Sequence, residues 1–115
     1  MSGAPSEPSG SEARQKLFLM SADDIEEGGV ARVEVEGVPP LAVYNVGGAF
    51  YATQDRCSHG NGDLSYGDLE GEEIICPYHG GAFNVVTGEP TRSPCGQPIR
   101  TYEVIVEGRN LYGLV

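Results

Sequence analysis

The 115-residue sequence predicts an all-β fold, and three features of the chain lead to this prediction. The 17 glycines and 8 prolines make the chain turn often, which favours short strands and loops over long helices. Apolar and polar residues alternate with a period of two in several segments, and no helical periodicity persists for two full turns. Because a chain of this length buries one modest core, we expect a single domain.

The expected strands follow one another from residue 17 onwards, with turn residues between them. The segments with strand character are 17–20, 30–35, 41–46, 49–53, 102–107 and 111–115. Gly47-Gly48 separates two of these segments and predicts a hairpin turn, and Arg109-Asn110 is expected to turn the last hairpin. Residues 23–29 are expected to form a loop with one helical turn at most.

The first sixteen residues differ in composition from the rest of the chain. Residues 1–16 are rich in Ser, Gly and Pro and contain almost nothing that a core could bury. We therefore expect a flexible tail over 1–16 and a folded domain over 17–115.

The charge of the chain limits the partners to be expected. With 17 acidic and 7 basic residues the formal charge is −10, which disfavours nucleic acid and anionic membranes and favours a basic patch on a protein partner. No apolar run reaches the roughly 18 residues of a membrane helix, and the first residues are small and polar rather than typical of a signal peptide. A cytoplasmic protein is the simplest expectation.

The segment between the β-rich ends holds all three cysteines and both histidines. Its two motifs are Cys57-Ser58-His59-Gly60 and Cys76-Pro77-Tyr78-His79-Gly80, which give the spacing C-x-H and C-x-x-H. Two thiolates and two imidazoles complete a four-ligand metal site. The alternatives are unrelated core cysteines with surface histidines, or zinc. Zinc fingers usually supply cysteines and histidines as separate pairs, whereas one Cys and one His from each loop suit a two-iron cluster.

These motifs and their surroundings resemble Rieske ferredoxins of bacterial aromatic-ring dioxygenase systems, with the nearest likeness to ferredoxins of carbazole or polycyclic-aromatic dioxygenases. The matching stretches are QDRCSHGNGDLSYGDLEG, EEIICPYHGGAFNVVTGEP, RSPCGQPIRTYEV and, upstream, PPLAVYNVGGAFYAT. The resemblance implies a Rieske fold, an antiparallel β-sandwich base with an inserted cluster-binding subdomain at about 56–92.

The resemblance also implies the roles of the four residues. Cys57 and Cys76 would ligate the inner iron of one 2Fe–2S cluster, and His59 and His79 the outer iron. The stretch Ser93-Pro94-Cys95 would match the loop that covers the cluster. Respiratory-chain members of the family carry a further cysteine in each cluster loop, and a disulfide links the two. This chain has Gly62 and Tyr78 at those positions, so it cannot form that disulfide. We expect the reduction potential of the cluster to lie near the low end of the Rieske range, at roughly −150 mV.

The function expected from this resemblance is that of a one-electron carrier rather than an enzyme. Its partners would be an NAD(P)H-dependent ferredoxin reductase and a terminal oxygenase, and the carrier is expected to be a monomer. The sequence shows no nucleophile–base pair, no nucleotide-binding glycine loop and no mononuclear iron triad. The alternatives are a ferredoxin of a diiron aromatic monooxygenase and a cluster-free or zinc-binding regulatory module.

Two further groups of residues carry expectations. Cys95 is surplus to the ligand set, and we expect it to pack as an apolar residue rather than to act as a fifth ligand or a redox thiol. Charged residues near the ligands are expected to be solvated, with a docking surface as the alternative. These residues are Asp55, Arg56, Asp63, Asp68 and Glu70.

Overall fold

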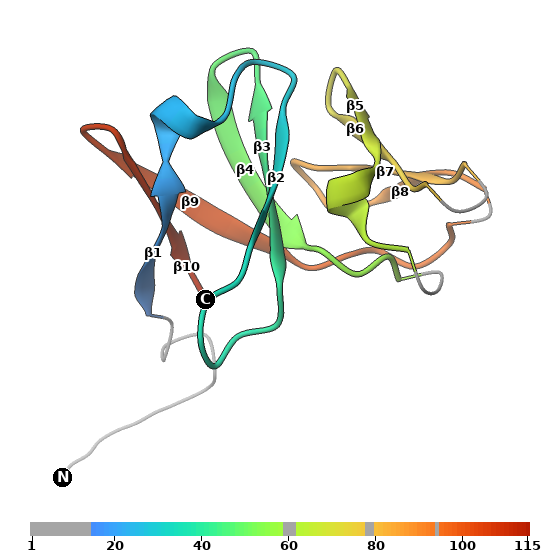
Figure 1. Cartoon of the computed structure of the whole chain (residues 1–115). Helices are drawn as coiled ribbons and strands as arrows, with labels where there is room; N and C mark the ends of the chain where they lie inside the picture. Colours follow the sequence, from blue (N-terminus) through green and yellow to red (C-terminus); the bar gives the residue numbers. More distant parts are fainter. Residues whose placement is uncertain (1–14, 59–61, 78–79, 94) are drawn as a thin grey trace, which may run out of the picture.

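The computed structural model describes residues 15–58, 62–77, 80–93 and 95–115, and its strands confirm the all-β expectation (Figure 1). Two antiparallel sheets, one of six strands and one of four, account for the strands of the described residues. Apart from strands, these residues form two short 3₁₀ turns, η3 (Ala22–Asp24) and η4 (Leu64–Tyr66).

The six-stranded sheet is the base of the molecule and curls around its own core. Its strand order is β1-β10-β9-β4-β3-β2. The strands are β1 (Lys16–Ser21), β2 (Val30–Val33), β3 (Leu41–Val46), β4 (Ala49–Gln54), β9 (Thr101–Glu107) and β10 (Asn110–Leu114). In Figure 1, β1, β9 and β10 stand on one side and β2, β3 and β4 on the other. The base core consists of Leu19, Ile25, Val33, Leu41, Val43, Ala52 and Leu111.

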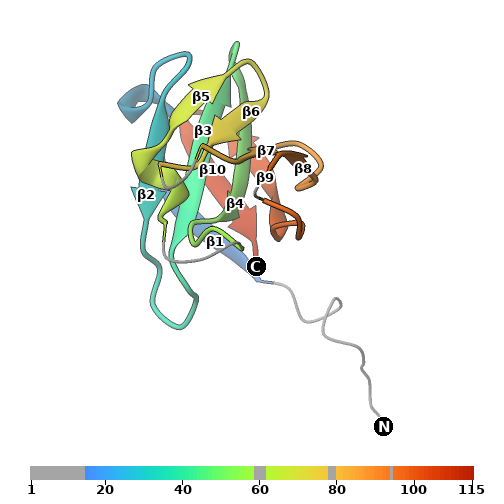
Figure 2. The same cartoon turned by 90° about the vertical axis from the view of Figure 1, so that its right-hand side faces the viewer.

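The four-stranded sheet comes between β4 and β9 in the sequence and lies beside the base (Figures 1 and 2). Its strands, in spatial order, are β5 (Asp68–Glu70), β6 (Glu73–Ile75), β7 (Ala82–Asn84) and β8 (Pro90–Arg92). The sequence does not predict β5, β6 and β8, because a strand of three residues is too short to show a period of two. The expected limits of the tail and of the subdomain over 56–92 stay predictions.

Two hairpins of the base, β3–β4 and β9–β10, form where short turns separate the strands. Gly47 and Gly48 have φ of +59° and +97°, so the turn between β3 and β4 needs the conformational freedom of glycine at both positions. The last hairpin differs by one residue from the expected one. Asn110 already pairs with Glu107, so that the turn consists of Gly108 and Arg109 rather than Arg109-Asn110.

Strand β3 lies between two cores, which explains why its sequence is a continuous apolar run. Leu41 and Val43 belong to the base core, while Ala42 and Tyr44 point to the other side. There they meet Ile74 and Phe83 of the small sheet. A strand buried on both faces loses the alternation of apolar and polar residues that a half-buried strand shows. The three cysteines belong to the same buried cluster as this second face of β3.

Candidate iron–sulfur centre

The first cysteine loop leaves β4 and closes on itself. Cys57 lies three residues after the end of β4, and its backbone N–H donates to the carbonyl of Gly62 at 2.8 Å. Just outside this bond, Arg56 and Asp63 form an isolated antiparallel bridge. The loop therefore begins and ends at a fixed point, with Cys57 itself 2% exposed.

The second cysteine loop is closed by the same kind of bond. Cys76 directly follows β6, and its backbone N–H donates to the carbonyl of Gly81 at 2.7 Å, just before β7. In both loops the acceptor glycine lies five residues after the cysteine. Cys76 is 1% exposed. Two equivalent closed loops thus present one buried cysteine each.

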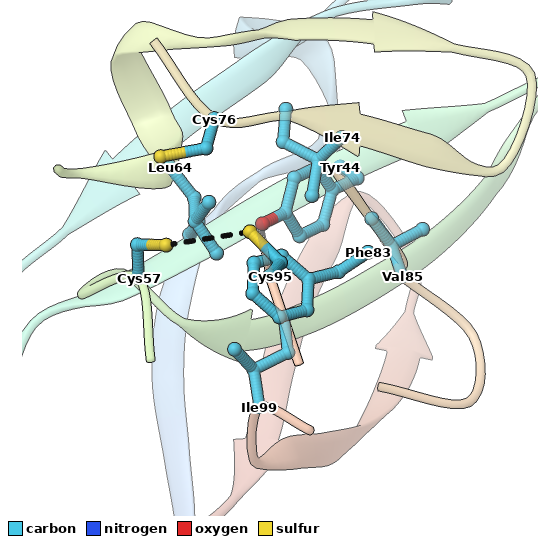
Figure 3. Packing of buried hydrophobic residues seen from close by; sticks show 10 residues of the cluster. Tyr44, Cys57, Leu64, Ile74, Cys76, Phe83, Val85, Cys95 and Ile99 are labelled. Carbon is cyan, nitrogen blue, oxygen red and sulfur yellow. Dashed lines mark hydrogen bonds between the residues drawn. The ribbon is translucent and has the colours of Figure 1, made fainter. Parts of the chain in front are cut away.

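Both cysteines meet in a single buried cluster between the base and the small sheet, here called the site core (Figure 3). Its members are Ala42, Tyr44, Cys57, Leu64, Ile74, Cys76, Phe83, Val85, Cys95 and Ile99. Tyr44 is fully buried, and its hydroxyl is 2.8 Å from Oγ1 of Thr53, which satisfies the polar atom inside this apolar cluster. Burial raises the pKa of Tyr44 above its usual value.

The third cysteine lies in the same cluster, as expected for a packed residue. Cys95 is 7% exposed, and its Sγ is 3.9 Å from Sγ of Cys57. Burial, together with the nearby Cys57 and Cys76, raises the pKa of Cys95 to about 12. A side chain on Gly81 would collide with it, because an added Cβ would lie 2.3 Å from the Cys95 sulfur.

Among the charged residues near the ligands, Arg56, Asp68 and Glu70 are exposed as expected, whereas Asp55 is buried. Its side chain is 1% exposed, and Oδ2 accepts a 2.6 Å hydrogen bond from Nη1 of Arg32 on β2. Its Oδ1 accepts from the backbone N–H of Ser65 at 2.7 Å, and its carbonyl accepts from the N–H of Leu64 at 2.6 Å. Sequence reasoning missed this role because the partner Arg32 lies 23 residues away. The buried carboxylate fixes the first cysteine loop to the base.

A second bond ties the first loop to the segment that carries Cys95. Oγ of Ser58 donates to the carbonyl of Gln97 at 2.6 Å. Within 92–95 the backbone N–H of Cys95 donates to the carbonyl of Arg92 at 3.1 Å. Three separate segments of the chain therefore converge on the buried cysteines.

The two histidines of the expected ligand set lie outside the described residues. His59 and His79 fall in the two cysteine loops by sequence, and Tyr78 and Pro94 also lie outside the described residues. Within the residues that the structure describes, no three His, Cys, Asp or Glu side chains are grouped as a metal site. The structure therefore brings together the cysteine half of the expected set.

Comparison with known proteins gives the family. The sequence matches the family model of the Rieske [2Fe-2S] domain over residues 15–103. The chain belongs to the Rieske [2Fe-2S] domain family. The Rieske fold expected from the sequence is thereby confirmed, and with it a Rieske-type 2Fe–2S cluster as the cofactor.

Three proteins similar to this Rieske protein are ferredoxins. Ferredoxin CarAc of Metapseudomonas resinovorans is 50% identical over 84% of this chain and 90% of its own length. The ferredoxin component of the p-cumate 2,3-dioxygenase system of Pseudomonas putida is 42% identical, over 82% of this chain and 80% of its own. A ferredoxin from Sphingomonas yanoikuyae B1 superposes with a TM-score of 0.84 at 39% identity, over 88% of this chain and 99% of its own.

These relatives are electron-transfer components, and the chain is accordingly an electron carrier rather than an enzyme. The recognised likeness to ferredoxins of aromatic-ring dioxygenase systems is confirmed. In the part of the chain that the structure describes, no helix is long and apolar enough to cross a membrane.

The described residues fit the cluster that the Rieske family implies. Thiolates favour iron–sulfur clusters, and a cluster with mixed ligands needs two of them close together and shielded from water. Cys57 and Cys76 meet this need, since both are nearly fully buried in one apolar cluster. Both loops are closed by the same kind of hydrogen bond, which fits a site to which each loop contributes one cysteine.

Proposed function

We propose that this chain carries electrons one at a time from an NAD(P)H-dependent ferredoxin reductase to the terminal oxygenase of an aromatic-ring dioxygenase system. The observation that carries the proposal is the pair of equivalent loops. Each is closed by a bond from the cysteine N–H to a glycine carbonyl, and both deliver a cysteine to the same buried cluster.

The proposed ligands are Cys57 and Cys76 for the inner iron and His59 and His79 for the outer iron. When bound, the cluster supplies a centre that accepts and releases one electron. The buried position of Cys57 and Cys76 supports the inner assignment, because their sulfurs are shielded from water by the site core. Two thiolates and two neutral imidazoles contribute two negative charges rather than the four of an all-cysteine set. Less charge at the site eases the uptake of an electron.

The relatives support the choice of partner. One solved structure holds the complex of reduced oxygenase and oxidised ferredoxin in carbazole 1,9a-dioxygenase, and its matching chain is 48% identical to this one with a TM-score of 0.82. That match covers 86% of this chain and 92% of the other. The formal charge of −10 suits a basic patch on the oxygenase and on the reductase. A carrier that alternates between two partners works best as a monomer with one exposed docking face, and we propose that state.

We also propose a cytoplasmic location. The chain has three cysteines, of which two are proposed as cluster ligands, so it does not resemble the disulfide scaffolds of secreted proteins.

Reconstitution of the electron chain tests the proposed function. The cluster-loaded protein is mixed with a purified reductase, NADH and the terminal oxygenase of a carbazole-type system, and hydroxylated product is measured. We expect product formation that depends on this chain and is lost in Cys76→Ser. If the reduced chain passes electrons to a diiron monooxygenase but not to the terminal oxygenase, the diiron monooxygenase is its partner instead. A chain that holds zinc or no metal would contradict the carrier role.

A further inference from the structure

Cys95 contacts both cysteine loops, although it belongs to neither of them. It is 7% exposed and lies in the site core with Cys57 and Cys76 (Figure 3). The ligand set proposed above is complete without it. A role for the third sulfur beyond packing rests on the proposed function of Cys57 and Cys76 as cluster ligands.

The first contact of Cys95 is with the sulfur of Cys57. The two Sγ atoms are 3.9 Å apart, within hydrogen-bonding range for sulfur. A cysteine that is not bound to metal carries an S–H, which is a weak donor, and a metal-bound thiolate sulfur carries the charge that attracts such a donor. The surrounding side chains, among them Leu64, Phe83 and Ile99, are apolar. In such surroundings even a weak hydrogen bond is electrostatically stronger than in water.

The second contact of Cys95 is with the backbone of Gly81. A Cβ added to Gly81 would lie 2.3 Å from Sγ of Cys95 and 3.0 Å from its backbone nitrogen. The sulfur thus fills the space beside Gly81, whose carbonyl closes the second loop by accepting from Cys76. Because Gly81 holds the sulfur from one side, Cys95 has little room to turn away from Cys57.

The backbone around Cys95 is held in place as well. Its N–H donates to the carbonyl of Arg92 at 3.1 Å, and the carbonyl of Gln97 accepts from Oγ of Ser58 at 2.6 Å. Ser58 directly follows Cys57, so the segment with Cys95 and the first loop are joined at two neighbouring points.

We propose that Cys95 is a positioning and tuning residue rather than a ligand, and that its thiol donates an S–H···S hydrogen bond to Sγ of Cys57. Such a bond draws negative charge from the ligand sulfur and favours the reduced state over the oxidised one. The reduction potential of the cluster is then higher than the same ligands would give with an apolar residue at position 95.

Substitutions at position 95 test the proposal through the midpoint potential of the purified, cluster-loaded protein. We expect Cys95→Ala to lower the midpoint potential. The equilibrium constant for one-electron reduction should fall by a few-fold to about tenfold, and a tenfold change corresponds to about 59 mV. Cys95→Ser keeps a donor and should lower the potential less. Leu111→Val removes one methylene from the base core, which contains none of the cysteines, and it should leave the potential unchanged.

The outcomes separate this inference from the proposed function. If the wild-type protein lacks the EPR spectrum of mixed nitrogen and sulfur ligation, the proposed ligand set itself fails. If the wild-type spectrum is present and Cys95→Ala keeps both the spectrum and the wild-type potential, only the hydrogen bond is refuted. Loss of that spectrum in Cys95→Ser, with a protein that remains folded, would make Cys95 a ligand and overturn the inference.

Infrared spectroscopy of the wild-type protein decides the matter even if the alanine variant does not take up the cluster. With Cys57 and Cys76 bound to iron, Cys95 is the only source of an S–H stretching band. We expect one such band in the loaded protein, shifted to lower frequency than that of a thiol in water and exchanged in D₂O. No S–H band, or a band at the frequency of a solvated thiol, would refute the hydrogen bond.

Discussion

Arg32 of β2 and Asp55, two residues before Cys57, form a hydrogen-bonded ion pair of 2.6 Å between Nη1 and Oδ2. The carboxylate is 1% exposed, whereas a third of the arginine side chain reaches solvent. Asp55 also holds the N–H of Ser65 on its other carboxylate oxygen. One buried side chain therefore connects the base to both ends of the first cysteine loop.

Removing this carboxylate should destabilise the fold. Asp55→Ala leaves the Ser65 N–H without its acceptor and removes a charge-assisted bond, so we predict a loss of about 2 to 4 kcal/mol in the free energy of unfolding. Urea unfolding of the cluster-free protein measures it. Asp68→Ala, which removes the same charge from an exposed position on β5, serves as the control and should stay within about 0.5 kcal/mol of wild type. Equal effects of the two substitutions would refute the structural role of Asp55.

Gly81→Ala should damage the site because no space exists for a methyl group. The added Cβ would approach Sγ of Cys95 to 2.3 Å and the carbonyl oxygen of Arg92 to 3.2 Å. Overpacking of this kind costs about 1 to 3 kcal/mol, and here it also displaces the loop that Cys76 begins. We predict a lower iron content per chain and a lower melting temperature.

Gly96→Ala is the matched control for Gly81→Ala, since an added Cβ there meets no atom within 4 Å. The double variant Gly81→Ala with Cys95→Ala should recover part of the lost iron, because it removes the closest clash. A single Gly81→Ala variant with full iron content and unchanged melting temperature would contradict the packing described here.

The thiol of Cys95 should resist alkylation in the native protein. Burial and the neighbouring cysteines raise its pKa from 9.0 to about 12, so little thiolate is present at pH 8. Iodoacetamide followed by mass spectrometry should show no label on Cys95 until the protein is unfolded. Rapid labelling of native Cys95 would contradict its burial.

The same shift gives a direction for stability against pH in the cluster-free protein. A thiol with a raised pKa in the folded state binds its proton more tightly there than in the unfolded chain. Its contribution is therefore complete below pH 9 and is lost as the pH rises toward 12. Wild type should lose more stability over this range than Cys95→Ala, as measured by urea unfolding at several pH values. Equal losses would remove Cys95 as the cause.

Salt should slow the transfer of electrons to the oxygenase. The chain carries a formal charge of −10, and attraction to a basic patch is screened as the ionic strength rises. Stopped-flow measurement of oxygenase reduction should show a rate that falls by about tenfold or more between low and high salt. Reduction of the chain by the dithionite anion, which its charge repels, should not slow down under the same change. A transfer rate independent of salt would argue against electrostatic docking.

The sequence was sufficient for the parts of the fold that depend on local pattern. The Gly47-Gly48 hairpin and the last hairpin were predicted because strand alternation and turn residues lie next to each other in the chain. Strands β5, β6 and β8 were not, since three residues cannot show a period of two. Cys57 and Cys76 were found as a pair through their spacing. The burial of Asp55 was missed, because it depends on Arg32, which only the folded chain brings close.

The spacing of the ligands also left the function of Cys95 open. Its packing was expected, but its contact with Cys57 joins residues 38 positions apart, and its sulfur occupies the space that a side chain at Gly81 would fill. Neither relationship leaves a signal in a single sequence.

Low-temperature EPR of the dithionite-reduced protein shows whether Cys57, Cys76, His59 and His79 hold one Rieske-type cluster. We predict a rhombic signal with the low average g-value of mixed nitrogen and sulfur ligation, absent from Cys57→Ser and Cys76→Ser. A signal typical of four-thiolate ligation, or zinc in place of iron on metal analysis, would contradict it.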